Sequence, residues 1–183
     1  MSGEKTELEP ALARFIEQFG KVDDTVTAVL KGHLLIEEAL DGIISNFVFH
    51  PEPLANARLG FAQKLQLARA MSLREHDNSM WNIAGALNSL RNELTHHLES
   101  PRRGRKVKAL LDAYRHETSG HPAEKHAEQP EPEAVQMCCA LFLGYLTTFR
   151  EEVDRFKELI GALDSTMNRP PAKAAVKSAG AGE

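Results

Sequence analysis

Residues 80–98 read Met-Trp-Asn-Ile-Ala-Gly-Ala-Leu-Asn-Ser-Leu-Arg-Asn-Glu-Leu-Thr-His-His-Leu. Within this run, leucine and isoleucine side chains recur every three or four residues, which is the repeat of an α-helix with one buried face. These side chains are Ile83, Leu87, Leu90, Leu94 and Leu98. Pro101 and Gly104 interrupt the pattern. We therefore predict one helix over residues 80–98 that turns its leucine face toward a core.

The same helical repeat runs through most of the chain. It predicts further helices over residues 9–19, 23–49, 54–71, 107–116 and 133–163. No segment alternates apolar and polar residues with the period of two that is typical of a strand. The predicted fold class is therefore all-α, an antiparallel helical bundle of about five to six helices.

The length of the chain fits one domain with extensions. We assign residues 8–164 to a single helical domain, in which residues 117–133 form a surface loop rich in Pro, Glu, His and Gly. Residues 1–7 are polar and are expected to be flexible. Residues 165–183, rich in Pro, Ala, Lys and Gly, are expected to be a disordered tail.

The composition limits the classes of function. Aromatic residues make up 6% of the chain and its net charge is −4, which argues against a protein that stacks single-stranded nucleic acid on aromatic rings. Any nucleic-acid contact would come from a local basic patch.

Cys138 and Cys139 are adjacent in an apolar run and are expected to be small buried side chains. With no signal peptide and no apolar stretch of about 18 residues, we expect a cytoplasmic protein without a membrane partner.

The side of the 80–98 helix opposite its leucines carries an unusual set of residues. At about 100° per residue, that side holds Trp81, Gly85, Asn88, Asn92 and His96. A glycine there lowers helix stability unless another surface packs closely against it. We therefore expect this face to meet a second copy of the chain across a twofold axis, with Trp81, Gly85 and Asn88 in the dimer interface.

Arg91, Asn92 and His96 combine the groups needed to cut a phosphodiester bond without a metal. A guanidinium holds a phosphate through several donors, and an imidazole can take or give a proton near neutral pH. Arg91 and His96 are separated by about 140° around the helix, so they converge poorly within one chain. A dimer would supply the second imidazole. We assign His96 as general acid and base, Arg91 as the phosphate clamp and Asn92 as an orienting group.

These residues lie in a wider pattern that resembles the HEPN family and, distantly, its mannitol operon repressor branch. The pattern has three parts, and the Arg91-Asn92-x-x-x-His96 motif is the last of them. The first is a long helix that carries Gly32-His33-Leu34-Leu35-Ile36-Glu37-Glu38-Ala39-Leu40, and the second is the segment Phe61-Ala62-Gln63-Lys64-Leu65. The resemblance covers roughly residues 22–160 and implies a helical bundle that usually dimerises.

The same resemblance carries expectations about activity. Many HEPN proteins are metal-independent ribonucleases, which implies that Arg91 and His96 act on RNA here. Several pair with a nucleotidyltransferase antitoxin, so such a partner is expected as well. Other members are regulatory or merely structural, and the resemblance implies the fold more firmly than the activity.

A cluster of cations follows the motif helix and is the candidate RNA-binding patch. It comprises Arg102, Arg103, Arg105 and Lys106, with Lys108 one turn on. Such a cluster could hold an RNA backbone, with a strong dependence on salt, or could be an ordinary exposed turn. Cations at the start of a helix are unfavourable for its dipole, which favours a functional reason.

The remaining histidines offer weaker signals. His33 lies on the apolar face of the 23–49 helix with Glu37 one turn later, and a buried hydrogen-bonded pair fits this better than a metal site because no third ligand is evident. His97 is expected to pack or to cap its helix. His116, His121 and His126 are expected to be solvated. No zinc motif, phosphate-binding glycine loop or nucleophile elbow is present, so no metal and no cofactor are predicted.

The sequence therefore favours a HEPN-like homodimer that acts as a metal-independent endoribonuclease. The alternative is a non-catalytic dimeric module with the same fold that binds RNA, a nucleotide or a protein. A third hypothesis is that the face from Trp81 to His96 serves only as a structural dimer contact.

Overall fold

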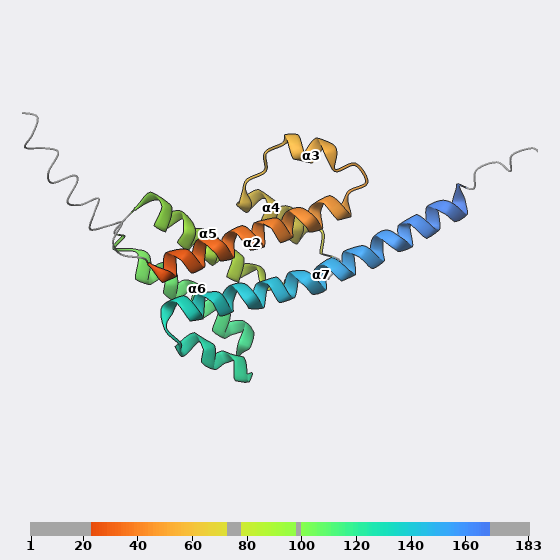
Figure 1. The fold of residues 1–183 in the computed structure, drawn as a ribbon. Coiled ribbons are helices and arrows are strands. Elements are labelled where there is room, and N and C mark those ends of the chain that lie inside the picture. Colours follow the sequence, from red (N-terminus) through yellow and green to blue (C-terminus); the bar gives the residue numbers. More distant parts are fainter. Residues whose placement is uncertain (1–22, 73–77, 98–99, 169–183) are drawn as a thin grey trace, which may run out of the picture.

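The computed structural model describes residues 23–72, 78–97 and 100–168, and within these ranges the regular structure is entirely helical. The helices shown in Figure 1 are α2 (Asp24–Phe47), α3 (Glu52–Asn56), α4 (Phe61–Ala70), α5 (Trp81–His96), α6 (Arg103–Thr118), the 3-10 helix η1 (Pro122–Glu128) and α7 (Glu131–Met167). The predicted all-α helical bundle is confirmed. In the parts of the chain described, no helix has the length and apolar character needed to cross a bilayer.

Some predicted segments fall outside these ranges. The helix expected over residues 9–19, the segment 1–7 and the tail beyond Asn168 are not described. The tail was expected to begin at residue 165, but α7 continues to Met167.

The long helix α2 begins at a residue suited to cap it. The Asp23 carboxylate accepts a hydrogen bond from the backbone N–H of Val26 at 3.1 Å, which satisfies one of the free amides at the helix start. The helix ends at Phe47, three residues before His50-Pro51, because proline cannot continue a helix. The predicted apolar face is buried, with Val29, Ile36 and Leu40 fully inaccessible.

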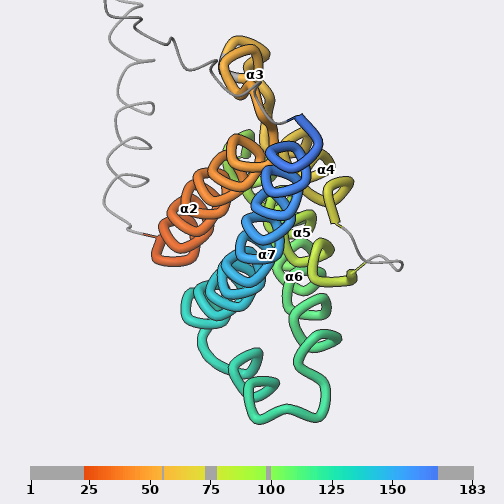
Figure 2. Tube along the Cα trace, turned by 90° about the vertical axis from the view of Figure 1, so that its right-hand side faces the viewer, coloured from red at the N-terminus to blue at the C-terminus, as the bar shows by residue number. Residues whose placement is uncertain are grey.

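α2 and α7 lie side by side in both ribbon and tube views (Figures 1 and 2). Their closest approach is at Gly32, where an added Cβ would lie 2.3 Å from Sγ of Cys139. Only glycine permits this spacing between the two helices. Cys138 and Cys139 are buried and unpaired, as predicted, and burial raises the pKa of each thiol to about 12.

α5 packs its leucine face into the same core. Ile83, Leu87 and Leu90 are fully buried, which confirms the predicted orientation of this helix. Trp81, its first residue, contacts three aromatic rings of α7 edge-on at centroid distances of 5.3 to 5.6 Å. Those rings belong to Phe142, Tyr145 and Phe149.

The helix predicted over residues 54–71 is wrong, because two helices occupy that region. α3 ends at Asn56, and Arg58 then adopts a positive φ of 47°, which breaks the helical path. α4 starts after Gly60, whose extended backbone N–H donates to Oε1 of Gln63 at 2.9 Å. This capping contact overrides the apolar repeat that suggested one continuous helix.

The region after α5 also differs from the prediction. α6 begins at Arg103 rather than at residue 107, because the Arg103 side chain anchors its first turn to two carboxylates described below. The loop predicted over 117–133 contains η1, which is tied to α6 by a hydrogen bond of 2.9 Å from the Tyr114 hydroxyl to the carbonyl of Ala123. α7 then starts at Glu131, so the loop is shorter than expected.

Candidate functional site

A polar groove with a volume of about 440 Å³ opens between α2, α4 and α5. We call it the Arg91 groove. Its walls are made by His33 and Glu37 of α2, Phe61 and Gln63 of α4, and Asn88, Arg91 and Asn92 of α5. Of the three residues predicted to be catalytic, it brings together Arg91 and Asn92, whereas His96 does not line it.

His33 forms the inner wall of this groove. It is only 6% exposed, its ring stacks on Phe61 at a centroid distance of 4.0 Å, and its Nε2 lies 3.1 Å from Oδ1 of Asn88. With the amide oxygen as acceptor, the ring donates from Nε2. Burial lowers the pKa of His33, the charge of Arg91 lowers it further, and Asn88 and Glu37 act in the opposite direction. The imidazole is therefore neutral at pH 7 and held in one orientation.

The predicted hydrogen bond between His33 and Glu37 is wrong. Their closest atoms, Nδ1 and Oε2, are 3.9 Å apart, which is too long for a hydrogen bond. Glu37 instead pairs with Lys64 of α4 at 2.9 Å. Lys64 also pairs with Asp41 at 2.7 Å, so the acidic residues on this side of α2 already have a cation.

Lys64 pairs with those carboxylates, and among the described residues no carboxylate pairs with the Arg91 guanidinium. Its hydrogen-bond contact is from Nη1 to Oδ1 of Asn92 at 3.1 Å, and no carboxylate of the described residues lies within ion-pair distance of it. Most of the five guanidinium N–H donors are thus free. A half-buried arginine with unused donors at the edge of a polar groove is suited to bind an anion.

His96 lies in the last turn of α5 and is exposed. Among the described residues it has no hydrogen-bond or ion-pair partner, so its imidazole is open to a ligand or to another chain. His97 is the C-cap of the same helix and is exposed, with Nε2 3.9 Å from Oε1 of Glu93. Of the two roles expected for His97, packing or capping, the structure shows the capping position and not a packed side chain.

The prediction that Trp81 lies in a dimer interface is wrong. Trp81 is 2% exposed and belongs to the core, because the first turn of α5 points toward α7 rather than away from it. Asn88 is half-buried and bonded to His33. Gly85 is exposed, and nothing lies within 4 Å of an added Cβ there, so no close packing in the described part of the chain explains the glycine.

The predicted RNA-binding cluster is divided between two roles. Arg102 and Arg105 are exposed. Arg103 instead pairs with Asp23 at the start of α2 and with Glu131 at the start of α7, the latter at 2.8 Å. Lys106 donates to the Ser89 hydroxyl of α5 at 2.6 Å. The expectation that Arg103 is free to contact RNA is therefore wrong, because this residue joins three helix starts.

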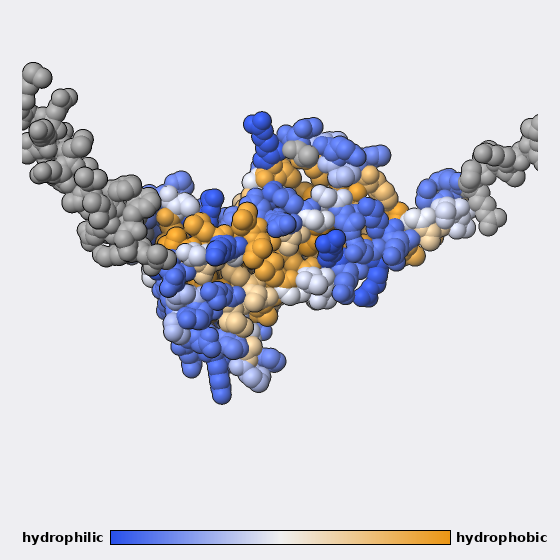
Figure 3. All heavy atoms as spheres, viewed as in Figure 1, coloured by the Kyte–Doolittle hydropathy of each residue, from blue (hydrophilic) through white to orange (hydrophobic). Residues whose placement is uncertain are grey.

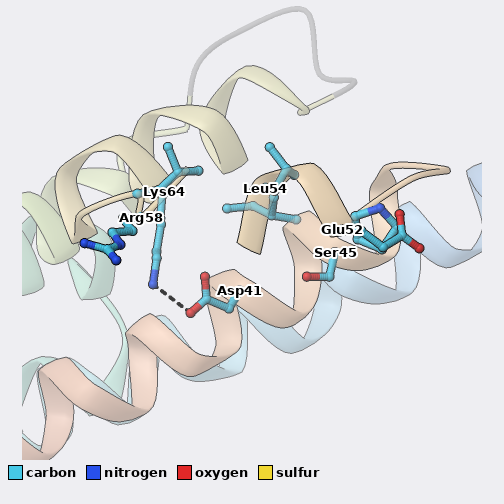
Figure 4. Close-up of a pocket in the computed structure, with 9 residues that line it drawn as sticks. Asp41, Ser45, Glu52, Leu54, Arg58 and Lys64 are labelled. Atoms are coloured by element: carbon cyan, nitrogen blue, oxygen red, sulfur yellow. Dashed lines mark hydrogen bonds and ion pairs between the residues drawn. The ribbon is translucent and has the colours of Figure 1, made fainter. Parts of the chain in front are cut away.

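A second pocket, of about 500 Å³, lies on the other side of Lys64 between α2, α3 and α4. Figure 4 shows Lys64 reaching across to Asp41, with Arg58 and Glu52 on opposite sides. Two cations and two carboxylates line this pocket, so their charges balance. This pocket is less suited to an anion than the Arg91 groove, because the Glu37 carboxylate in that groove is already paired with Lys64.

Sequence reasoning missed the contribution of His33, Asn88 and Lys64 to the site. The i, i+4 series of polar residues at 33, 37 and 41 on an otherwise apolar helix was the signal that could have found it. Within the described ranges, no three His, Cys, Asp or Glu side chains are grouped so that they could hold a metal ion. Comparisons of the chain with protein-family models, with curated proteins and with solved structures give no match.

Proposed function

We propose that the protein is a HEPN-like, metal-independent endoribonuclease that acts as a homodimer. The observation that carries this proposal is the Arg91 guanidinium, which lies in an open polar groove without a carboxylate partner among the described residues. RNA presents an anion at every nucleotide, and a guanidinium fork matches a phosphate in both charge and geometry.

The chemistry follows from the groups near that guanidinium. Arg91 binds the scissile phosphate and stabilises the charge that develops on it, and Asn92 orients one of its oxygens. A His96 imidazole removes the proton of the ribose 2′-hydroxyl, whose oxygen attacks phosphorus. The bond to the 5′ oxygen then breaks, and this oxygen takes a proton from a second imidazole in its protonated form, which is His96 of the other copy in the dimer.

Partners and location follow from the same proposal. RNA is the substrate, and a nucleotidyltransferase antitoxin would restrain the activity in the manner of several HEPN proteins. The exposed Arg102 and Arg105 extend the positive surface beyond the end of α5. The two buried, unpaired thiols of Cys138 and Cys139 suit the reducing cytoplasm, where we place the protein.

The test is RNA cleavage by the purified protein in excess EDTA. Arg91→Ala and His96→Ala should each lower the rate by about 10²-fold or more. Matched controls are Arg155→Ala and His116→Ala, which remove an exposed arginine and an exposed histidine of α7 and α6. Both controls should cleave like the wild type. Equal cleavage by all five proteins would assign the activity to a contaminant and overturn the proposal.

One observation favours a second function, binding without cleavage. His96 does not line the Arg91 groove, so an anion held by Arg91 within one chain lies in a groove without that imidazole. In this case the protein would bind a labelled RNA oligonucleotide and leave it intact. Arg91→Ala would then weaken binding, whereas His96→Ala would change neither binding nor the integrity of the RNA.

A further inference from the structure

The outward side of α2 exposes large apolar side chains that no other described part of the chain covers. Leu30, Leu34 and Leu35 are 42%, 65% and 52% exposed, respectively. Figure 3 shows apolar surface gathered over the N-terminal half of α2 and the adjacent part of α7. Isolated exposed leucines are common, but three within two turns form a patch that favours contact with another surface.

The residues on this side of α2 are arranged symmetrically about a point between Leu34 and Leu35. We call them the outer stripe: Thr27, Lys31, Leu34, Leu35, Glu38 and Gly42. If a second α2 lies antiparallel with its centre at the same point, each residue meets its counterpart. Lys31 then lies opposite Glu38, Leu34 opposite Leu35, and Thr27 opposite Gly42. A twofold contact requires a self-complementary surface of this kind.

The two charges of the outer stripe have no ion-pair partner among the described residues. Lys31 and Glu38 are both exposed, and neither forms an ion pair with any described residue. They are seven residues apart, about 10 Å along the helix axis, so they do not pair with each other in one copy. In the antiparallel arrangement they form two intermolecular pairs on either side of the leucines.

Space for the leucines of a second copy lies beside the outer stripe. A groove of about 510 Å³ runs between α2 and α7 and is lined by apolar atoms of Gly32, Leu35, Ala140 and Leu143, among others. A leucine from a facing helix can enter this groove beside Leu35 and Leu143, which line it.

We propose that two copies of this chain associate through the outer stripes of their α2 helices, packed antiparallel about Leu34 and Leu35. The ribonuclease proposal already includes a homodimer; the new inference is the surface through which it forms, and this inference rests on the α2 residues alone and not on RNA cleavage. It also replaces the α5 surface around Trp81, which is buried. A salt-sensitive contact is expected, because the two ion pairs lie at the rim of the apolar centre.

The arrangement has a consequence for the Arg91 groove. The twofold axis of an antiparallel helix pair stands perpendicular to the plane that contains both helices. His33 and Glu37, which line the groove, lie at the level of that axis but about 110° to 150° around α2 from the centre of the outer stripe. The two grooves therefore lie on the sides of the α2 helices that face away from the contact, and the contact does not cover them.

Charge reversal tests the proposal on the full-length protein without RNA. Lys31→Glu makes both charged positions of the stripe acidic, and Glu38→Lys makes both basic. In sedimentation equilibrium, the wild type should form a dimer, and each variant alone should bind itself at least about tenfold more weakly. An equimolar mixture of the two should recover a heterodimer, and the double variant should recover a homodimer. Lys108→Glu and Glu128→Lys, exposed on α6 and η1, are the controls and should dimerise like the wild type.

The outcomes separate this proposal from the enzyme proposal. A wild type that is monomeric at every concentration would overturn the α2 contact. This outcome includes the case in which residues 1–22 of the same chain cover the outer stripe. A dimer unaffected by either single variant, or a mixture that fails to recover association, would also overturn it. Circular dichroism confirms that each variant is folded. A dimer without ribonuclease activity leaves the α2 contact intact and overturns only the enzyme proposal. RNA cleavage by a monomer overturns the α2 contact and also the dimeric form of the enzyme proposal.

Discussion

Gly32 and His33 are neighbours in α2, yet they face two regions with opposite character. Gly32 faces the seam between α2 and α7, where the helices are too close to admit a Cβ beside Cys139. His33 faces the Arg91 groove, where polar side chains leave open volume and Arg91 has no carboxylate partner among the described residues. At Gly32 the two helices are in contact and leave no room for a side chain, so this residue serves the fold. Unused donors and open space in the groove are what a ligand needs.

The largest expected effect on stability is in the seam, from Gly32→Ala. The new Cβ would lie 2.3 Å from Sγ of Cys139, and overpacking of this kind lowers the free energy of unfolding by about 1–3 kcal/mol. Chemical denaturation in urea measures it. Adding Cys139→Ala removes the sulfur, so the double variant should lose less stability than the sum of the two single variants.

Gly85 is the matched control for that substitution, because it is also a helical glycine but has nothing within 4 Å of an added Cβ. Gly85→Ala should raise the free energy of unfolding by up to about 1 kcal/mol through helix propensity. A Gly32→Ala protein as stable as the wild type would mean that the seam is looser than the structure indicates. The contrast between the two regions would then fail.

A smaller effect separates the two arginines. Arg103 joins Asp23 and Glu131 at the end of the seam, and because all three groups remain partly exposed, Arg103→Ala should cost only about 1 kcal/mol of unfolding free energy. Arg91→Ala, by contrast, should change stability by less than about 0.5 kcal/mol. Equal losses from both substitutions would show that Arg91 also serves the fold.

The pH dependence sharpens this second comparison. The hydrogen bond from Arg103 lowers the pKa of Asp23 below its usual value of 3.8 despite the opposing effect of burial. A carboxyl whose pKa is lower in the folded state than in the unfolded state stabilises the fold at pH values above its unfolded-state pKa. This stabilisation is lost as the pH falls through its folded-state pKa. The difference in stability between wild type and Arg103→Ala should therefore shrink below about pH 4, which denaturation at several pH values measures.

Much of the fold could be predicted because the apolar repeat is strong in the long helices. The buried faces of α2 and α5 follow directly from the spacing of Ile36, Leu40, Leu87 and Leu90. The break between α3 and α4 was missed, since capping at Gly60 is a local contact that periodicity does not encode. Trp81 was misplaced because a helical wheel treats the helix as having one buried face, whereas α7 covers a second side of α5 at its first turn.

Less of the candidate site could be predicted. The Arg91-Asn92 pair was found from the motif, because both residues lie on one helix. The contributions of His33 and Lys64 depend on three helices that meet in space, and no spacing along the chain reports that meeting. The role of Arg103 was misjudged for the same reason, since its carboxylate partners lie at the starts of two other helices.

The smallest expected effect is the titration of His33, and it bears on the groove itself. Burial, and then the positive charge of Arg91, lower the pKa of this imidazole below 6.5, while Asn88 and Glu37 partly offset them. Because the folded state prefers the neutral ring, His33 contributes stability above about pH 6.5 that is lost as the pH falls below that value. His33→Gln cannot titrate, so its stability should fall less than that of the wild type between pH 7 and 5. An NMR titration of the ring should show the lowered pKa directly, and Arg91→Ala should raise it. A His33 pKa that does not respond to Arg91→Ala would mean that the guanidinium points away from the groove, and the anion site would lose its central residue.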